Sequence, residues 1–108
     1  MSEWLGNLGG MAAACDNLGD VFRLGGKLEG AEAMHRRGLS LDQARGSREG
    51  MAFAYGNLGN IRLARGDKEN ARALYAQSVA LFDDVGNAPL AAMVRERLDG
   101  LRETHSPG

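Results

Sequence analysis

The feature that most restricts how this chain can fold is an internal repeat with a period of 40 residues. Residues 11–50 align with residues 51–90 without a gap, and twelve of these forty positions are identical. A chance alignment of this composition would give about three identities, and a fixed period in this range is typical of stacked supersecondary units. The recurring residues include Asn17/Asn57, Leu18/Leu58, Gly19/Gly59, Gly26/Gly66, Ala31/Ala71 and Gly46/Gly86.

Each repeat divides into two helical stretches. Small and apolar residues recur at three- and four-residue spacing, and glycines interrupt the pattern at regular places. Gly66 predicts the end of one helix, and Asp67 predicts the N-cap of the next. No stretch shows the two-residue alternation of a half-buried strand. The sequence therefore predicts an all-α fold, an α–α superhelix of about two and a half helix-turn-helix repeats, with five helices near residues 11–24, 28–45, 50–65, 68–85 and 89–103.

The register of the repeat predicts a single domain over residues 1–108. Residues 1–10 are interpreted as the end of a preceding partial repeat, residues 11–50 and 51–90 as two repeats, residues 91–103 as a closing helix and residues 104–108 as a disordered tail. The amino end has no polar closing helix. Trp4, Leu5 and Leu8 could cover it, a second copy could pair with it, or it once met a further repeat that this sequence does not include.

The repeated small residues predict where the helices of one repeat approach closely. A glycine inside a helix costs about 1 kcal/mol relative to alanine, so its recurrence at Gly19 and Gly59 indicates a packing advantage. We expect each glycine to face an alanine of the second helix, Ala31 or Ala71, with neighbouring leucines filling the grooves.

Charge and composition exclude several classes of function. The chain has 13 basic and 14 acidic residues, so it lacks the concentrated basic surface that nucleic-acid binding requires, and we expect no nucleic-acid partner. No stretch approaches the roughly 18 apolar residues of a membrane helix, and a signal peptide is not indicated. A single cysteine, Cys15, permits no internal disulfide and favours a reducing, cytoplasmic location.

No group of residues predicts catalysis, a metal site or a cofactor. His35 occupies a core aromatic position of its repeat, which favours a packed or hydrogen-bonded histidine over a metal ligand. Cys15 aligns with Tyr55 and is interpreted as a small buried residue. We therefore predict that the chain is not an enzyme.

The run Tyr55-Gly56-Asn57-Leu58-Gly59-Asn60, followed by Gly66-Asp67 and Ala71, resembles the signature of the tetratricopeptide repeat (TPR) family. The family's usual proline is replaced by Gln43 and Asp83, and the period exceeds the common 34 residues. This 40-residue variant is similar to the repeats of Pins/LGN polarity scaffolds and kinesin light chains. The resemblance covers residues 11–103 and implies a TPR solenoid that acts as a scaffold or adaptor.

The resemblance also implies that the first helix of each repeat lines a concave groove. The implied partner-binding residues are Asn17, Asp20, Arg23, Phe53, Asn57, Asn60, Met93 and Arg97. In relatives with this period an asparagine at the position of Asn17 and Asn57 bonds the main chain of a bound peptide, which suits an amide that both donates and accepts. The alternative is that each asparagine only bonds a neighbouring helix. A carboxylate clamp for chaperone tails is disfavoured, because Asp16 and Asp20 occupy its first-repeat positions.

Two functions remain open at this point. The favoured one is a non-catalytic protein–protein interaction module that binds a peptide or protein segment in the groove. The alternative is a self-associating structural protein, a homodimer formed through the open repeat ends, with no separate peptide ligand.

Overall fold

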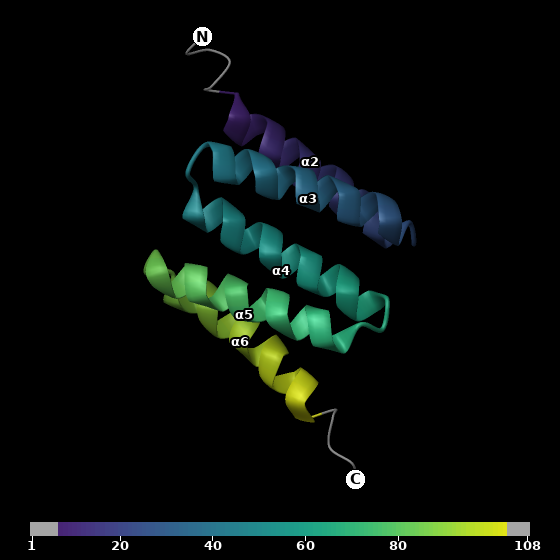
Figure 1. The fold of residues 1–108 in the computed structure, drawn as a ribbon, viewed down its shortest axis with the longest axis vertical. Coiled ribbons are helices and arrows are strands. Elements are labelled where there is room, and N and C mark those ends of the chain that lie inside the picture. The colour runs from purple at the N-terminus through teal and green to yellow at the C-terminus, as the bar shows by residue number, and fades with distance from the viewer. Residues whose placement is uncertain (1–6, 104–108) are drawn as a thin grey trace.

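Five helices follow one another along residues 7–103, the part of the chain that the computed structural model describes (Figure 1). They are α2 (Leu8–Leu24), α3 (Leu28–Ala44), α4 (Arg48–Ala64), α5 (Lys68–Asp84) and α6 (Ala88–Glu103). No strand occurs in these described residues. The predicted all-α fold is confirmed, while the expectations for residues 1–6 and 104–108 lie outside the described part of the chain.

The helix boundaries keep the period of the sequence. Helices α2, α4 and α6 begin at Leu8, Arg48 and Ala88, which are 40 residues apart, and α3 and α5 begin at Leu28 and Lys68. The first helix begins three residues earlier than predicted, so Leu8, Gly9 and Gly10 form the first turn of α2. This start corresponds to the first turn of α4, which holds Arg48, Glu49 and Gly50.

Four glycines end the first four helices with the same backbone geometry. Gly26, Gly46, Gly66 and Gly86 have φ angles between 71° and 82°, the left-handed region that glycine enters without a Cβ penalty. At each turn the following residue donates its N–H back to a carbonyl five residues earlier, as Asp67 does to Arg62. Asp67 also caps α5, because its carboxylate accepts the N–H of Asn70 at 3.2 Å. The predicted glycine stops and the predicted Asp67 cap are confirmed.

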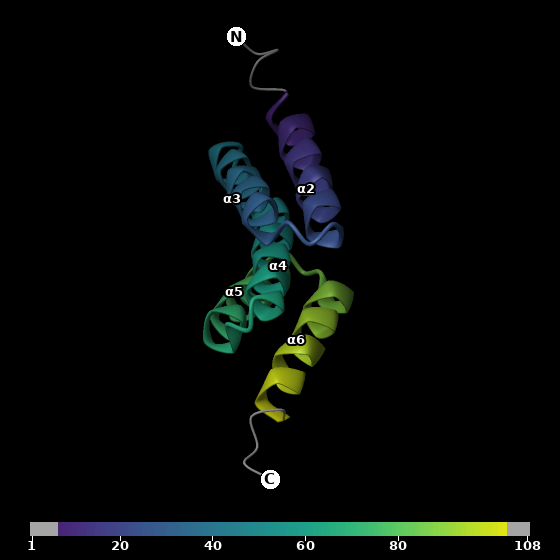
Figure 2. The same cartoon turned by 90° about the vertical axis from the view of Figure 1, so that its right-hand side faces the viewer.

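The helices form two antiparallel pairs, α2 with α3 and α4 with α5, and α6 packs on α5 (Figure 1). Figure 2 shows α2 and α6 on one side of the molecule, α3 and α5 on the other, and α4 in the middle. Helix α4 packs on both α3 and α5, whereas α2 has only α3 as a full neighbour. The pairs therefore stack in the order that a superhelix of helix pairs requires.

The repeated glycines inside α2 and α4 make room for rings rather than for alanines. A Cβ at Gly59 would lie 2.7 Å from Cε1 of Tyr75, and one at Gly19 would lie 2.5 Å from Nε2 of His35. The expectation that each glycine faces Ala31 or Ala71 is therefore wrong. The two alanines are fully buried, but it is the larger ring one turn further along that needs the missing side chain.

The apolar core is concentrated in the second half of the molecule. Tyr75 and Phe82 are each 1% exposed, and they belong to one cluster of buried residues with Ala52, Ala71, Val79, Ala91, Val94 and Leu101. This cluster joins α4, α5 and α6 and fixes the position of α6 over the second pair. The rigid floor and one wall of the groove described below come from these three helices.

A buried carboxylate fastens the first pair to the second. Glu32 on α3 accepts hydrogen bonds from Arg62 at 2.6 Å and Arg65 at 3.0 Å, both on or next to α4, and also from Arg36 on its own helix. Burial alone would raise the pKa of Glu32, but the hydrogen bond from Arg36 and the charges of the three arginines outweigh it and lower that pKa. The three arginines therefore stabilise the ionised form of Glu32, which links the two helix pairs through its hydrogen bonds to Arg62 and Arg65.

Within residues 7–103, none of the helices combines the length and the apolar character needed to cross a bilayer.

Candidate partner-binding groove

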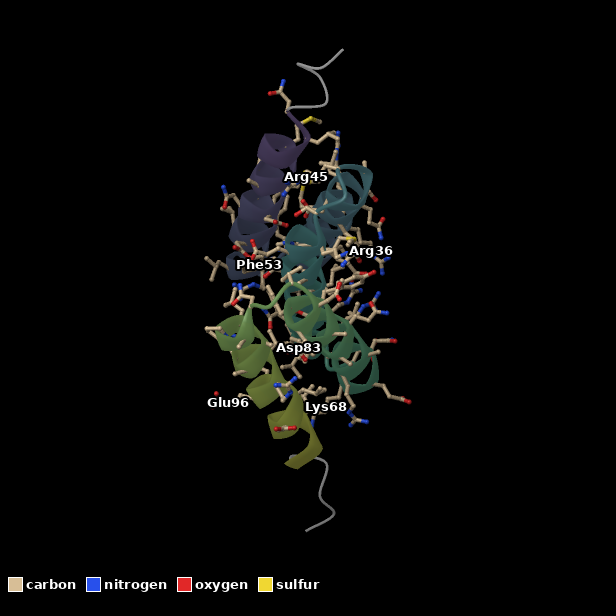
Figure 3. All side chains as sticks on the ribbon, turned by 90° about the vertical axis from the view of Figure 1, so that its left-hand side faces the viewer. Arg36, Arg45, Phe53, Lys68, Asp83 and Glu96 are labelled. Atoms are coloured by element: carbon tan, nitrogen blue, oxygen red, sulfur yellow. The ribbon has the colours of Figure 1, made fainter. Side chains whose placement is uncertain are left out.

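A pocket of about 220 Å³ opens between α4 and α6, above α5. It is lined by Ala52, Phe53, Gly56, Asn57, Asn60, Tyr75, Ser78, Phe82, Met93, Val94 and Arg97. Small-molecule sites usually enclose about 300–1,000 Å³, so this pocket suits one or two side chains of a larger partner better than a cofactor. Figure 3 shows Phe53 in the space between α2 and α6.

The floor of this pocket is held by a chain of hydrogen bonds. The Tyr75 hydroxyl donates to Oδ1 of Asn60 at 2.5 Å, and Arg97 donates to the same oxygen at 2.8 Å. Burial raises the pKa of Tyr75, so the phenol stays protonated and remains a donor. Because Arg97 comes from α6, this network joins both sides of the pocket and fixes one guanidinium at its edge.

Beside this polar corner the pocket is aromatic. The rings of Phe53 and Phe82 meet edge to face, with centroids 5.1 Å apart and planes at 85°. Ser78 donates its hydroxyl to the main-chain carbonyl of Ala52 at 2.7 Å, which holds α5 close to α4 at this level. Phe53 and Met93 are 42% and 45% exposed, so apolar surface faces the opening.

Asn57 differs from the other polar residues of the pocket, because Asn60, Tyr75, Ser78 and Arg97 all form internal hydrogen bonds. Its side chain is partly exposed and forms no hydrogen bond within residues 7–103. Asn60, one turn further on, already accepts two hydrogen bonds through Oδ1. The Asn57 amide can therefore donate to and accept from a bound main chain without breaking an internal contact.

The groove continues between α2 and α4 with different chemistry. A second pocket of about 230 Å³ is lined by Gly9, Ala12, Ala13, Asp16, Asp42, Arg45, Ser47, Glu49, Gly50 and Phe53. Phe53 belongs to both pockets and separates them. The first pocket is aromatic with one arginine, whereas the second carries three carboxylates and one arginine.

His35 bonds one aspartate at this end. Its ring is fully buried, and its Nδ1 lies 3.1 Å from the Asp16 carboxylate, within hydrogen-bond distance. Its Nε2 lies 3.6 Å from Asp20, too far for a hydrogen bond, and has no hydrogen-bond partner among the described residues. Gly38 gives Asp16 its space, since a Cβ there would lie 3.0 Å from the Asp16 carboxylate. The interpretation of His35 as a packed, hydrogen-bonded histidine is confirmed.

Asp42 lies at the inner end of the second pocket and is 1% exposed. Burial raises the pKa of its carboxyl group, against a 3.0 Å hydrogen bond from Arg45 that lowers it. The repeat places Phe82 at the same position in the second unit, so a carboxylate here replaces an aromatic ring there.

The structure brings together five of the eight residues expected in the groove, namely Phe53, Asn57, Asn60, Met93 and Arg97. The other three lie on α2 outside both pockets. Asn17 is exposed and has no partner among the described residues, while Asp20 lies 3.9 Å from Arg23. Whether any of the eight contacts a partner stays a prediction.

Several groove residues were not expected from the sequence. Asp42, Tyr75, Ser78 and Phe82 all line a pocket, and all four come from second helices. The alignment of His35 with Tyr75 could have indicated a buried ring in each unit, but not its partner, because Tyr75 bonds Asn60 whereas His35 bonds Asp16, which aligns with Gly56. Among the described residues, no group of three or more histidine, cysteine, aspartate or glutamate side chains is arranged to hold a metal ion. Cys15 is buried, as expected.

Stacked antiparallel helix pairs with a groove along their first helices define a helical-repeat interaction module. The family model for the tetratricopeptide repeat matches residues 10–84, so the chain belongs to the tetratricopeptide repeat family. Members of this class hold other proteins, and a protein–protein interaction module is the general function that this membership supports. Comparison with curated proteins and with solved structures gives no match.

Proposed function

We propose that the groove over α4 binds an extended segment of a partner protein and that the chain acts as a non-catalytic adaptor, with no cofactor. The observation that carries this proposal is the Asn57 amide, which is free of internal hydrogen bonds within the described residues and lies beside the apolar surface of Phe53 and Met93. An extended main chain needs such a donor–acceptor group, and its side chains need apolar pockets.

The charges at the two ends of the groove favour one orientation of the segment. Asp16, Asp42 and Glu49 line the α2 end together with Arg45, while Arg97 lies at the α6 end. A segment with a basic residue toward α2, an apolar anchor over Phe53 and an acidic or carbonyl group near Arg97 complements this pattern. The repeats that this period resembles, in Pins/LGN scaffolds and kinesin light chains, offer a model for such binding. We place this activity in the cytoplasm, where the single Cys15 thiol stays reduced.

The test is a peptide selection followed by calorimetry. Random peptides displayed on phage are selected on the immobilised chain, and Kd is measured for the tightest one with the wild type, with Phe53→Ala and with the double variant Asn17→Ala/Asn57→Ala. We expect each variant to raise Kd at least about tenfold, because an anchor pocket or the main-chain contact is lost.

Lys68→Ala is the matched control, since Lys68 is exposed at the start of α5 and lines neither pocket. Circular dichroism verifies that every variant keeps its helices. A Kd that the double asparagine variant leaves unchanged contradicts the proposed contact.

A further inference from the structure

Helix α2, at the amino-terminal end of the stack, carries apolar side chains that nothing in the described molecule covers. We define the α2 stripe as Met11, Ala14, Leu18 and Val21. Leu18 and Val21 are 49% and 63% exposed, whereas their equivalents in α4, Leu58 and Ile61, are 4% and 0% exposed. Half of the large exposed hydrophobic residues in residues 7–103 lie on α2: Met11, Leu18, Val21 and Leu24. An apolar concentration of this kind marks an interaction surface.

The α2 stripe has the spacing of a helix–helix seam. Its members follow one another at intervals of three, four and three residues, which places them along one side of the helix. If two copies of α2 run antiparallel about a two-fold axis, Ala14 of each copy meets Leu18 of the other and Met11 meets Val21. Each small residue then faces a large one, as good packing requires.

From this self-complementarity we propose that the α2 stripe binds the α2 stripe of a second copy of the chain and forms a two-fold symmetric dimer.

The charges around the stripe favour α2 of a second copy over a helix that would pack on the stripe as α3 packs on α4. Where α4 meets α3, Arg62 and Arg65 bind Glu32 at the edge of the contact. The equivalent positions of α2 hold Phe22 and Gly25, which offer no partner for such a carboxylate. The stripe and these flanking residues are uncharged, so a two-fold contact brings no like charges together.

The opposite end of the molecule does not suit a head-to-tail contact. Helix α6 exposes Glu96 and Asp99, and an apolar stripe placed on them would remove their charges from water without compensation. A closed two-fold dimer through α2 avoids this cost, whereas a filament would have to meet it at every junction.

The α2 stripe and the pocket at Asn57 lie on different faces, so this inference does not rest on the proposed function. The contact is one helix face about 25 Å long, at the small end of specific interfaces. We therefore expect a reversible dimer whose population rises with concentration.

Sedimentation velocity of the full chain between about 1 µM and about 1 mM tests the proposal. We expect a monomer–dimer equilibrium in the wild type, and a dissociation constant at least about tenfold higher in Leu18→Glu, which buries carboxylates in the seam. Leu63→Glu, an equally simple change at an exposed leucine of α4 outside the stripe, leaves the equilibrium unchanged.

A charge pair then tests the register. Ala14→Lys combined with Leu18→Glu places opposite charges across the two-fold contact and restores dimerisation relative to Leu18→Glu alone. Circular dichroism verifies the fold of each variant. A wild type that stays monomeric throughout, whether residues 1–6 or another partner covers the stripe, overturns the proposal, and so does a dimer that Leu18→Glu does not weaken.

Discussion

The first and second helix pairs share one backbone plan but fill its interior with different chemistry. In α2–α3 a buried His35 is bonded to Asp16, and Asp42 is buried two turns further along α3. In α4–α5 the corresponding ring is Tyr75, bonded to Asn60, and Phe82 takes the place of Asp42. The glycine in front of each ring is the same. The shared glycines and turns therefore determine the backbone of each helix pair. The buried residues that differ between the pairs determine the chemistry of each half of the groove.

The largest expected effect tests where the apolar core lies. Phe82→Ala should destabilise the chain by about 3–5 kcal/mol, because it empties a site that is 1% exposed within the buried cluster. Asp42→Ala, at the same position of the first unit, should cost less than about 1 kcal/mol, since it also removes a desolvated carboxylate and leaves Arg45 free to reach water. Urea denaturation measures both. Equal losses would show that the two units have equivalent cores.

The second effect tests the glycine that the units share. Gly59→Leu and Gly19→Leu should each destabilise by about 3 kcal/mol, because even a Cβ would overlap the ring of Tyr75 or His35. Thermal melts followed by circular dichroism give the two midpoints. A melting temperature unchanged in either variant would mean that the ring can move aside and that the close approach is not required.

A smaller effect concerns the contact between the units and depends on pH. The pKa of Glu32 is lowered in the folded state, so its contribution is present above the unfolded value near 4.5 and is lost as the pH falls through the folded value. Glu32→Gln should therefore cost about 1 kcal/mol at pH 7 and flatten the loss of stability between about pH 5 and pH 3.

Arg72→Gln is the control for this pH effect, because Arg72 occupies the position of Glu32 in the second unit and its Nε has no partner within the described residues. Urea denaturation at a series of pH values compares the three proteins. An acid limb as steep in Glu32→Gln as in the wild type would show that Glu32 does not link the units through its charge.

The smallest effect has the opposite sign. Gly100 lies inside α6, and a Cβ there would meet no other atom within 4 Å. Gly100→Ala should stabilise the chain by up to about 1 kcal/mol through helix propensity alone. A loss of stability in the same urea assay would reveal a close approach to α6 and would weaken the distinction between packing and non-packing glycines.

The sequence predicted the fold because its signals are local. The 40-residue period, the four glycine stops and the Asp67 cap depend on residues within one or two helical turns of each other. The predicted start of the first helix is three residues late because residues 1–10 are assigned to the end of a preceding repeat, whereas Leu8, Gly9 and Gly10 form its first turn, as Arg48, Glu49 and Gly50 do in α4.

The site was only partly predictable, because its contacts join residues distant in the sequence. The bonds of Glu32 to Arg62 and of Arg97 to Asn60 span 30 and 37 residues, and a repeat alignment gives faces of helices but not such partners. The pairing of Gly59 with Tyr75 instead of Ala71 also depends on the relative shift of two helices. The position of Asn57 in the pocket, by contrast, agrees with what the resemblance to the tetratricopeptide repeat family implies.

The most direct test of a groove centred on Asn57 is a titration of isotope-labelled wild-type chain with the tightest selected peptide, followed by proton–nitrogen correlation spectra. We predict that the side-chain amide of Asn57 and the backbone amides of Phe53 and Arg97 shift with the same Kd as calorimetry, while Leu18 and Val21 on the α2 stripe do not move. Shifts confined to α3 and the outer side of α5, with the Asn57 amide unmoved at saturation, would contradict it.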